Sequence, residues 1–354
     1  MKTENMTTLP VPNLISRSLL RYGSFLIALV ASAALSAHAQ NLVLNPGFET
    51  GDFTDWTIRG SGYFVGQGAP HSGRYSAVLG GSGLLDQPIT TVVGQSYQVS
   101  FWLSNFNPFG SMPNNFFTVS FAGVTILDLR NSPTFGYTHF SGAVTATSTS
   151  SDLSFAFYHV MHIGFPHWNL DDVSVTAAPA LQLYSVFSPK THGGAGTFNI
   201  YFLPLGGVPG VECRSGGAGG NHTFVFTFTN NVVSGNATVT SGIGTVSGPP
   251  MFSYSTMTVN LTGVADVQRI IVTLTGVTDS FGQVLPDTAV SADMLIGDTT
   301  GNRTVNSSDI AQVKAQAGLP VDATNFREDV TVDGVINASD IGLVKSKSGD
   351  SLPP

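Results

Sequence analysis

The strongest constraint in this sequence is a twelve-residue segment near its C-terminal end that occurs twice, with an offset of 31 residues. The first copy covers residues 298–309 and the second covers residues 329–340. Both copies carry oxygen-bearing side chains at positions 1, 3, 5, 9 and 12 and an apolar residue at position 8, and each leads into a short amphipathic pattern. The pattern predicts two equivalent units, each consisting of a loop followed by a helix.

This spacing is that of an EF-hand-like calcium loop, in which position 7 supplies a backbone carbonyl. Calcium is a hard cation and prefers several carboxylate, amide and carbonyl oxygens. The alternative is a pair of helices capped by Asn and Asp without a metal. The predicted ligands are Asp298, Thr300, Asn302, Thr304, Asn306 and Asp309 in the first loop, and Asp329, Thr331, Asp333, Val335, Asn337 and Asp340 in the second.

Two such loops, each ending in Asp and followed by one helix, resemble a type I dockerin from Asp298 to about Pro354. The resemblance implies attachment to a cohesin-like protein, with positions 10 and 11 helping to choose the partner. These positions are Ser307, Ser308, Ala338 and Ser339.

The repeat departs from the dockerin pattern at position 3, where Thr replaces Asn or Asp, and at position 6 of the first loop, where Arg303 replaces Gly. A non-Gly residue in left-handed geometry costs roughly 1–2 kcal/mol. The first loop also carries fewer acidic residues, so we expect the second loop to bind calcium more tightly.

Composition favours β-rich globular structure for the rest of the chain, since only 10% of its residues are charged and it contains 40 Gly and 19 Pro. A net charge of −8 with 14 Lys and Arg argues against binding to nucleic acid. The single cysteine, Cys213, excludes a disulfide scaffold and a thiolate zinc site. We expect a neutral or cation-binding partner.

The first 39 residues have the order of a secretory signal peptide: basic residues, an apolar run at 25–35, and the sequence Ala37-His38-Ala39. Cleavage is expected before Gln40, which predicts a secreted or cell-surface protein without membrane insertion after cleavage. The alternative is a retained anchor, for which the apolar run is shorter than the ~20 residues that span a bilayer.

Residues 40–179 alternate with period two, as in a β-sandwich, and Tyr97, Val99, Phe101 and Leu103 share one face. The segments at 45–49, 51–56, 72–75 and 168–175 resemble the galactose-binding-like jelly rolls of carbohydrate-binding modules of families 4, 9 and 22. The resemblance implies a structural calcium held by Glu49 and Asp171. The alternative is that these acids only solvate strand ends.

The same alternation predicts an exposed aromatic face, because it turns Trp102, Tyr137, His139 and Tyr158 away from the core. Flat aromatic rings beside polar groups suit the stacking of sugars. The alternative is a second apolar layer covered by the insertion with Phe106 and Phe109. We interpret the nearby histidines, His159, His162 and His167, as surface residues rather than zinc ligands.

Residues 180–296 predict a second sandwich of seven short strands, loosely similar to bacterial immunoglobulin-like spacer domains. The predicted fold is therefore mainly β: a jelly roll, an immunoglobulin-like sandwich, and a small α-helical calcium-binding module at 297–354. No nucleophile or metalloprotease motif is present. Glu212 has several Asp residues as possible partners in the second sandwich, but they form no recognisable catalytic pattern.

The function that the sequence favours is a secreted, non-catalytic protein that binds a polysaccharide or oligosaccharide and attaches through calcium-dependent loops. One alternative is an extracellular glycoside hydrolase or an accessory subunit of such an enzyme. The other is a structural surface adhesin.

Overall fold

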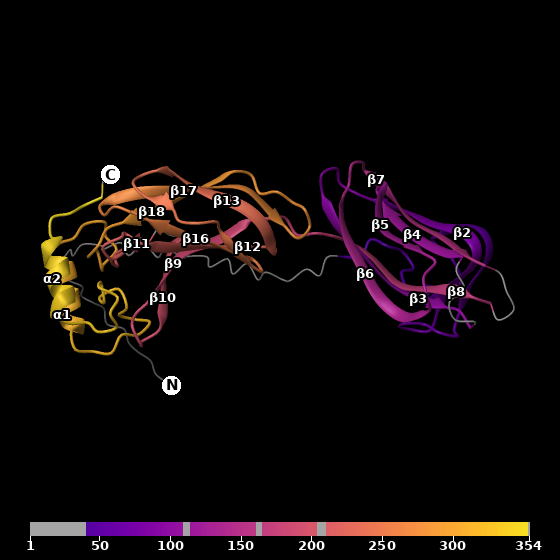
Figure 1. Ribbon diagram of the computed structural model, residues 1–354, viewed down its shortest axis with the longest axis horizontal. Helices are drawn as coiled ribbons and strands as arrows, with labels where there is room; N and C mark the ends of the chain where they lie inside the picture. The colour runs from indigo at the N-terminus through magenta and orange to yellow at the C-terminus, as the bar shows by residue number, and fades with distance from the viewer. Residues whose placement is uncertain (1–39, 109–113, 161–164, 204–209, 353–354) are drawn as a thin grey trace, which may run out of the picture. The chain divides into compact units, whose positions relative to one another are not determined.

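The computed structural model describes residues 40–108, 114–160, 165–203 and 210–352 (Figure 1). The predicted signal peptide, Phe109, His162 and Pro354 lie outside the described residues. Within these ranges, no helix is both long and apolar enough to cross a membrane.

The first eight strands form one hydrogen-bonded sheet in the order β5-β4-β7-β2-β8-β3-β6, with β1 paired to β2. We call these strands the N-terminal sandwich, because Figure 1 shows them as two facing layers. Their bounds are β1 Thr57–Gly66, β2 Ser76–Thr90, β3 Ser96–Phe106, β4 Asn115–Phe121, β5 Val124–Arg130, β6 Phe135–Thr145, β7 Ser150–His159 and β8 His167–Ala177.

Strand β2 connects the two layers. Its first part, at residues 77–79, pairs with β8, and its second part, at residues 82–90, pairs with β7. The change of partner falls at Gly80-Gly81-Ser82-Gly83, opposite a register shift in β1. Gly81 has φ +63°, and a Cβ there would meet the Ser61 carbonyl oxygen at 2.5 Å. Glycine therefore permits both the bend and the close approach of β1.

The alternation predicted for β3 is confirmed. Tyr97 is 3% exposed, and Val99, Phe101 and Leu103 are completely buried. They pack in one core with Phe155 and other apolar residues of the opposite layer.

The next ten strands form two further sheets, which we call the middle sandwich. One sheet has the order β10-β9-β12-β16-β14 with β15 paired to β16, and the other has the order β11-β18-β17-β13. Both sheets contribute side chains to one apolar core. Their bounds are β9 Leu183–Thr191, β10 Thr197–Leu203, β11 Val211–Glu212, β12 His222–Phe228, β13 Val232–Ser241, β14 Thr245–Val246, β15 Met251–Ser253, β16 Thr256–Thr262, β17 Gln268–Asp279 and β18 Thr288–Met294.

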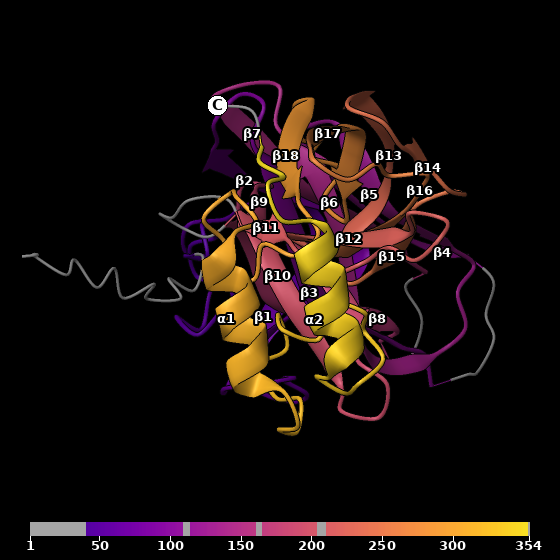
Figure 2. The same ribbon diagram turned by 90° about the vertical axis from the view of Figure 1, so that its left-hand side faces the viewer.

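The C-terminal residues 297–352, which we call the repeat pair, form two helices, α1 at Ser307–Gln316 and α2 at Ala338–Ser346. The helices lie side by side (Figure 2). Val313 of α1 and Val344 of α2 are buried in a small core that also includes Val211 and Leu295 from the preceding part of the chain. The fold class is confirmed as mainly β with two short C-terminal helices.

Candidate functional site

In the first loop (298–309), three of the predicted ligand side chains converge, those of Asp298, Thr300 and Asp309. Thr300 Oγ1 donates a hydrogen bond to Asp309 Oδ1 at 2.9 Å and lies 3.3 Å from Asp298 Oδ1. Both aspartates are completely buried. Burial raises the pKa of Asp298 and the charge of Asp309 raises it further, against backbone hydrogen bonds from Arg303 and Asn302 that lower it. The loop thus holds two buried carboxylates close together.

The second loop (329–340) repeats this geometry. Thr331 Oγ1 donates to Asp340 Oδ1 at 2.9 Å and lies 3.5 Å from Asp329 Oδ1, and both aspartates are again completely buried. One contact is new: His192 Nδ1 lies 2.9 Å from Asp329 Oδ2. Burial raises the pKa of Asp329, but the hydrogen bonds from His192 and from the Gly334 N–H outweigh it and hold that pKa below its usual value.

The donor set of both loops fits a calcium ion. Each loop buries two carboxylates that approach the same threonine hydroxyl, at Thr300 in the first loop and Thr331 in the second. Buried carboxylates without a counter-charge are unfavourable unless they are paired or coordinate a metal. A hard cation at each loop would supply that charge, held by the residues predicted from the sequence.

The helix caps that the metal-free alternative predicts are formed in the structure. Asn306 and Asn337 are the N-caps of α1 and α2, and each forms a capping box with the aspartate at position 12. The capping box uses Oδ2 of Asp309 and Asp340, whereas Oδ1 faces the threonine at position 3. Capping and calcium binding can therefore coexist.

The predicted difference in backbone strain between the two loops is wrong. Arg303 at position 6 has φ +71°, as expected, and Gly301 at position 4 has φ +72°. In the second loop the roles are exchanged, since Val332 at position 4 has φ +64° and Gly334 at position 6 has φ +89°. Each loop therefore holds one non-Gly residue in left-handed geometry, and the one in the second loop is β-branched. Only the larger number of carboxylates still predicts that the second loop binds calcium more tightly.

The second loop is connected to the middle sandwich by a chain of buried polar groups. His192, which contacts Asp329, also lies 3.3 Å from Arg214 Nη1. Arg214 Nε and Nη2 each donate to one carboxylate oxygen of Glu212 at 2.8 Å. All four side chains are at most 1% exposed. Glu212, which the sequence offered as a possible catalytic acid, is thus enclosed in an ion pair that, despite burial, lowers its pKa to about 2.

The residues predicted to contact a cohesin-like partner lie at the start of the two helices, where all four are exposed. They are Ser307 and Ser308 of α1 and Ala338 and Ser339 of α2. Their role in partner binding stays a prediction.

In the N-terminal sandwich, Glu49 and Asp171 approach the same loop, residues 71–75. The two carboxylates accept backbone N–H groups of this loop at 2.8–3.2 Å. Burial raises the pKa of Asp171 to about 6, against hydrogen bonds to backbone N–H groups that lower it. These hydrogen bonds account for both carboxylates without an ion, so a calcium site here stays a prediction.

The predicted aromatic face is only partly assembled. The Trp102 ring stacks on His71 with centroids 3.9 Å apart and lies 5.2 Å from His139. The Tyr137 hydroxyl donates to the Ala69 carbonyl oxygen at 2.8 Å, and burial raises its pKa to about 12. Because His71 covers the Trp102 ring, this cluster is more closed than the sequence predicts.

Tyr158 does not belong to this cluster. It lies on β7 and stacks on Phe116 of β4, whereas Trp102 lies on β3, and β8 and β2 intervene in the sheet order. The interpretation of His159 as a surface residue is also wrong, because it is completely buried and its Nε2 lies 3.1 Å from Asn105 Oδ1. Burial lowers the pKa of His159 to about 4.

A cavity of about 310 Å³, which the sequence did not predict, is lined in part by Ala69, the residue whose carbonyl oxygen accepts the hydrogen bond from Tyr137. Two of its walls are phenyl rings, Phe64 at 48% exposed and Phe106 at 44% exposed. His167 lies against Phe106, with ring centroids 5.1 Å apart. The sequence predicts Phe106 only as part of a covering insertion, and Phe64 lies on β1. The remaining lining residues are Gly68, Ala69, Val78 and Asn169.

Asn169 gives this cavity a polar group without a partner. The residue is 4% exposed, and its Nδ2 donates to Ser104 Oγ at 3.0 Å. Within the part of the chain that the structure describes, its Oδ1 accepts no hydrogen bond. A buried carbonyl oxygen without a donor costs free energy, so a ligand hydroxyl would be favourable here.

Residues 296–347 match the family model of the Dockerin type I domain, which confirms the resemblance of the repeat pair. No curated protein matches the chain. Among solved structures, the chain is similar to the carbohydrate-binding module TmCBM61 in complex with beta-1,4-galactotriose (19% identity, TM-score 0.31, covering 40% of this chain and 100% of that chain).

Two further solved structures are similar at lower identity. One is a family 4 carbohydrate-binding module (14% identity, TM-score 0.28, covering 38% of this chain and 99% of that chain). The other is the K1 cleaved adhesin domain of Lys-gingipain from Porphyromonas gingivalis W83 (14% identity, TM-score 0.29, covering 38% of this chain and 96% of that chain). The chain thus carries a dockerin-like segment, and its structural neighbours include carbohydrate-binding modules.

Proposed function

We propose that this protein is exported, binds a polysaccharide through its N-terminal sandwich, and attaches to a cohesin-like protein through the repeat pair. The three functional parts would be residues 40–179, 180–296 and 297–354, after removal of residues 1–39. Calcium would hold the loops of the repeat pair in the shape that the partner recognises. The middle sandwich would act as a spacer.

The observation that carries the glycan-binding proposal is the cavity lined by Phe64, Phe106, His167 and Asn169. Exposed aromatic rings offer flat faces to the C–H groups of a sugar, and the unpartnered Asn169 Oδ1 can accept a hydrogen bond from a sugar hydroxyl. The cavity volume of about 310 Å³ falls at the lower end of the range for small-molecule sites. This combination favours a neutral sugar unit.

Affinity electrophoresis of the protein in gels that contain plant, algal or bacterial polysaccharides tests the proposal. We expect retardation in at least one glycan, and Phe106→Ala should weaken the binding about two- to twelvefold, because an aromatic contact contributes about 0.5–1.5 kcal/mol. Tyr184→Ala is the matched control, since Tyr184 is an aromatic residue of the middle sandwich that is 57% exposed. Retardation that persists in Phe64→Ala and Phe106→Ala would move the site elsewhere, for example to the Trp102 cluster.

The same glycan also separates binding from hydrolysis. Hydrolysis requires two carboxyl groups about 5–9.5 Å apart across the scissile bond. Glu212, the acid singled out in the middle sandwich, is bound on both oxygens by Arg214. We therefore expect no release of reducing ends, whereas turnover that is lost in Glu212→Gln would favour a glycoside hydrolase. Failure to bind any glycan would favour an adhesin.

A further inference from the structure

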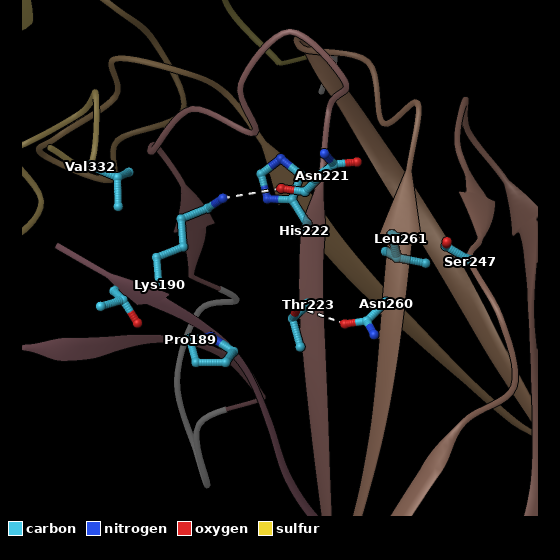
Figure 3. A pocket seen from close by; sticks show the side chains of 10 residues that line it. Pro189, Lys190, Asn221, His222, Thr223, Ser247, Asn260, Leu261 and Val332 are labelled. Carbon is cyan, nitrogen blue, oxygen red and sulfur yellow. Dashed lines mark hydrogen bonds between the residues drawn. The ribbon is translucent and has the colours of Figure 1, made fainter. Parts of the chain in front are cut away.

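A second cavity, of about 490 Å³, lies where β9, β12 and β16 of the middle sandwich are neighbours in one sheet, and Val332 of the second loop also lines it (Figure 3). Its lining differs from that of the N-terminal cavity, because it is rich in amide, hydroxyl and amino groups. The polar side chains that line it are Lys190, Thr191, Asn221, His222, Thr223, Ser247 and Asn260.

Lys190 is the only cationic residue among those that line this cavity. The side chain is half-buried, and Nζ donates to the Asn221 carbonyl oxygen at 3.2 Å. An ammonium group has three N–H donors, yet among the described residues Lys190 forms no ion pair. The nearby carboxylate of Glu212 is already bound by Arg214. Burial lowers the pKa of Lys190, as expected for a cation with poor compensation.

Other polar groups line the same cavity as the Lys190 ammonium. Figure 3 shows Lys190 reaching toward Asn221 and His222. His222 is 6% exposed, and its Nδ1 has no hydrogen-bond partner in the described part of the chain. Asn260 Oδ1 accepts a hydrogen bond from Thr223 Oγ1 at 2.9 Å, which leaves the Nδ2 donor of Asn260 available. A cation and several neutral polar groups therefore line one cavity.

The protein as a whole is acidic, with a net charge of −8, so an unpaired lysine beside a cavity is not part of a general basic surface. We propose that this cavity binds a sugar unit that carries an anionic group, either a carboxylate or a sulfate, with the anion held by Lys190. Asn260 and Thr223 would contact the hydroxyls of the same sugar. The volume of about 490 Å³ is within the range for small-molecule sites.

Isothermal titration of the protein with trigalacturonate, a sulfated galacto-oligosaccharide and neutral galactotriose tests this site. We expect at least one anionic ligand to bind, and the two ligands distinguish a carboxylate from a sulfate. Lys190→Gln should weaken that binding about ten- to a hundredfold, because hydrogen bonds to charged groups contribute about 1.5–3 kcal/mol. Lys314→Gln, at an exposed lysine of α1, is the matched control and should change nothing. Added salt should also weaken the binding.

Two results would overturn the proposal. One is that neither anionic ligand binds, and the other is that binding is the same in Lys190→Gln, in Asn260→Ala and in the unaltered protein. The outcome is independent of the proposed function, because Phe106→Ala should impair binding of neutral glycans and leave the Lys190 cavity unaffected.

Discussion

The two loops of the repeat pair share a sequence pattern and a set of internal hydrogen bonds, but they have different neighbours. The carboxylate of Asp298 accepts hydrogen bonds from its own loop, whereas the carboxylate of Asp329 also contacts His192, 137 residues earlier in the chain. His192 in turn contacts Arg214, which is paired with Glu212. Equivalent positions in a repeat can therefore have unequal surroundings, and we expect unequal chemistry from them.

Backbone contacts add to this difference. Gly193 and Gly334 lie so close that a Cβ on Gly193 would meet the Asp333 carbonyl oxygen at 2.4 Å. The Ser215 N–H donates to the Val330 carbonyl oxygen at 2.8 Å. The first loop also contacts the middle sandwich, but through the Arg303 side chain, which lies 3.4 Å from Asp293. The second loop is thus held by its backbone and by the carboxylate of Asp329, a predicted calcium ligand.

The largest effect that separates the loops should come from the aspartates at position 12. We expect calorimetry with calcium to show two unequal binding events, and Asp309→Ala and Asp340→Ala should each abolish one of them. Asp340→Ala should remove the tighter event, because the second loop also carries Asp333. Asp287→Ala, at an exposed acid of the middle sandwich, is the control. Identical circular dichroism and calorimetry with and without calcium would contradict the predicted calcium sites.

The next largest effect concerns the buried ion pair of Arg214 and Glu212, which is linked to the second loop through His192. Arg214→Met leaves the Glu212 carboxylate buried without its partner, so we expect the free energy of unfolding to fall by about 3–5 kcal/mol. Arg130→Met is the matched control, because Arg130 is 64% exposed and pairs with Asp128, and its loss should cost at most about 1 kcal/mol. Chemical denaturation measures both. Equal losses would mean that the buried pair gives the second loop no special support.

His192→Ala should affect calcium binding at the second loop alone. Groups that hydrogen-bond to a metal ligand typically change the metal affinity 10- to 100-fold when they are removed, and His192 positions Asp329 in this way. We expect the calorimetric event of the second loop to weaken by about that factor while the event of the first loop stays unchanged. An equal change in both events would show that His192 acts through general stability.

The smallest effect should come from relief of backbone strain. Val332→Gly and Arg303→Gly each remove a non-Gly residue from left-handed geometry. The relief of strain exceeds the entropic cost of ordering the more flexible glycine, so each substitution should stabilise the folded loop by about 1 kcal/mol. Arg303→Gly also removes the contact with Asp293, so we expect the gain in calcium affinity to be larger for Val332→Gly. The reverse order in calorimetry would contradict this account of strain.

The local sequence pattern was sufficient to predict several structural features. The alternation at residues 97–103 predicted which side chains are buried, because successive residues of a strand point to opposite faces. The repeat located both loops and both helices, since its offset is regular and each helix begins directly after its Asn cap. Strand β2 could not be traced from local alternation, because its glycines interrupt the pattern where it changes layer.

Which side chains meet in space, in contrast, depends on the tertiary structure. Alternation placed Tyr158 and Trp102 on outward faces, but it contains no information on strand order, which separates them. The cavity of about 310 Å³ joins Phe64, Phe106 and Asn169 from three strands, and no local pattern connects those positions. The contact between His192 and Asp329 arises in the same way, because residues far apart in sequence meet only after the sheets and the repeat pair have packed.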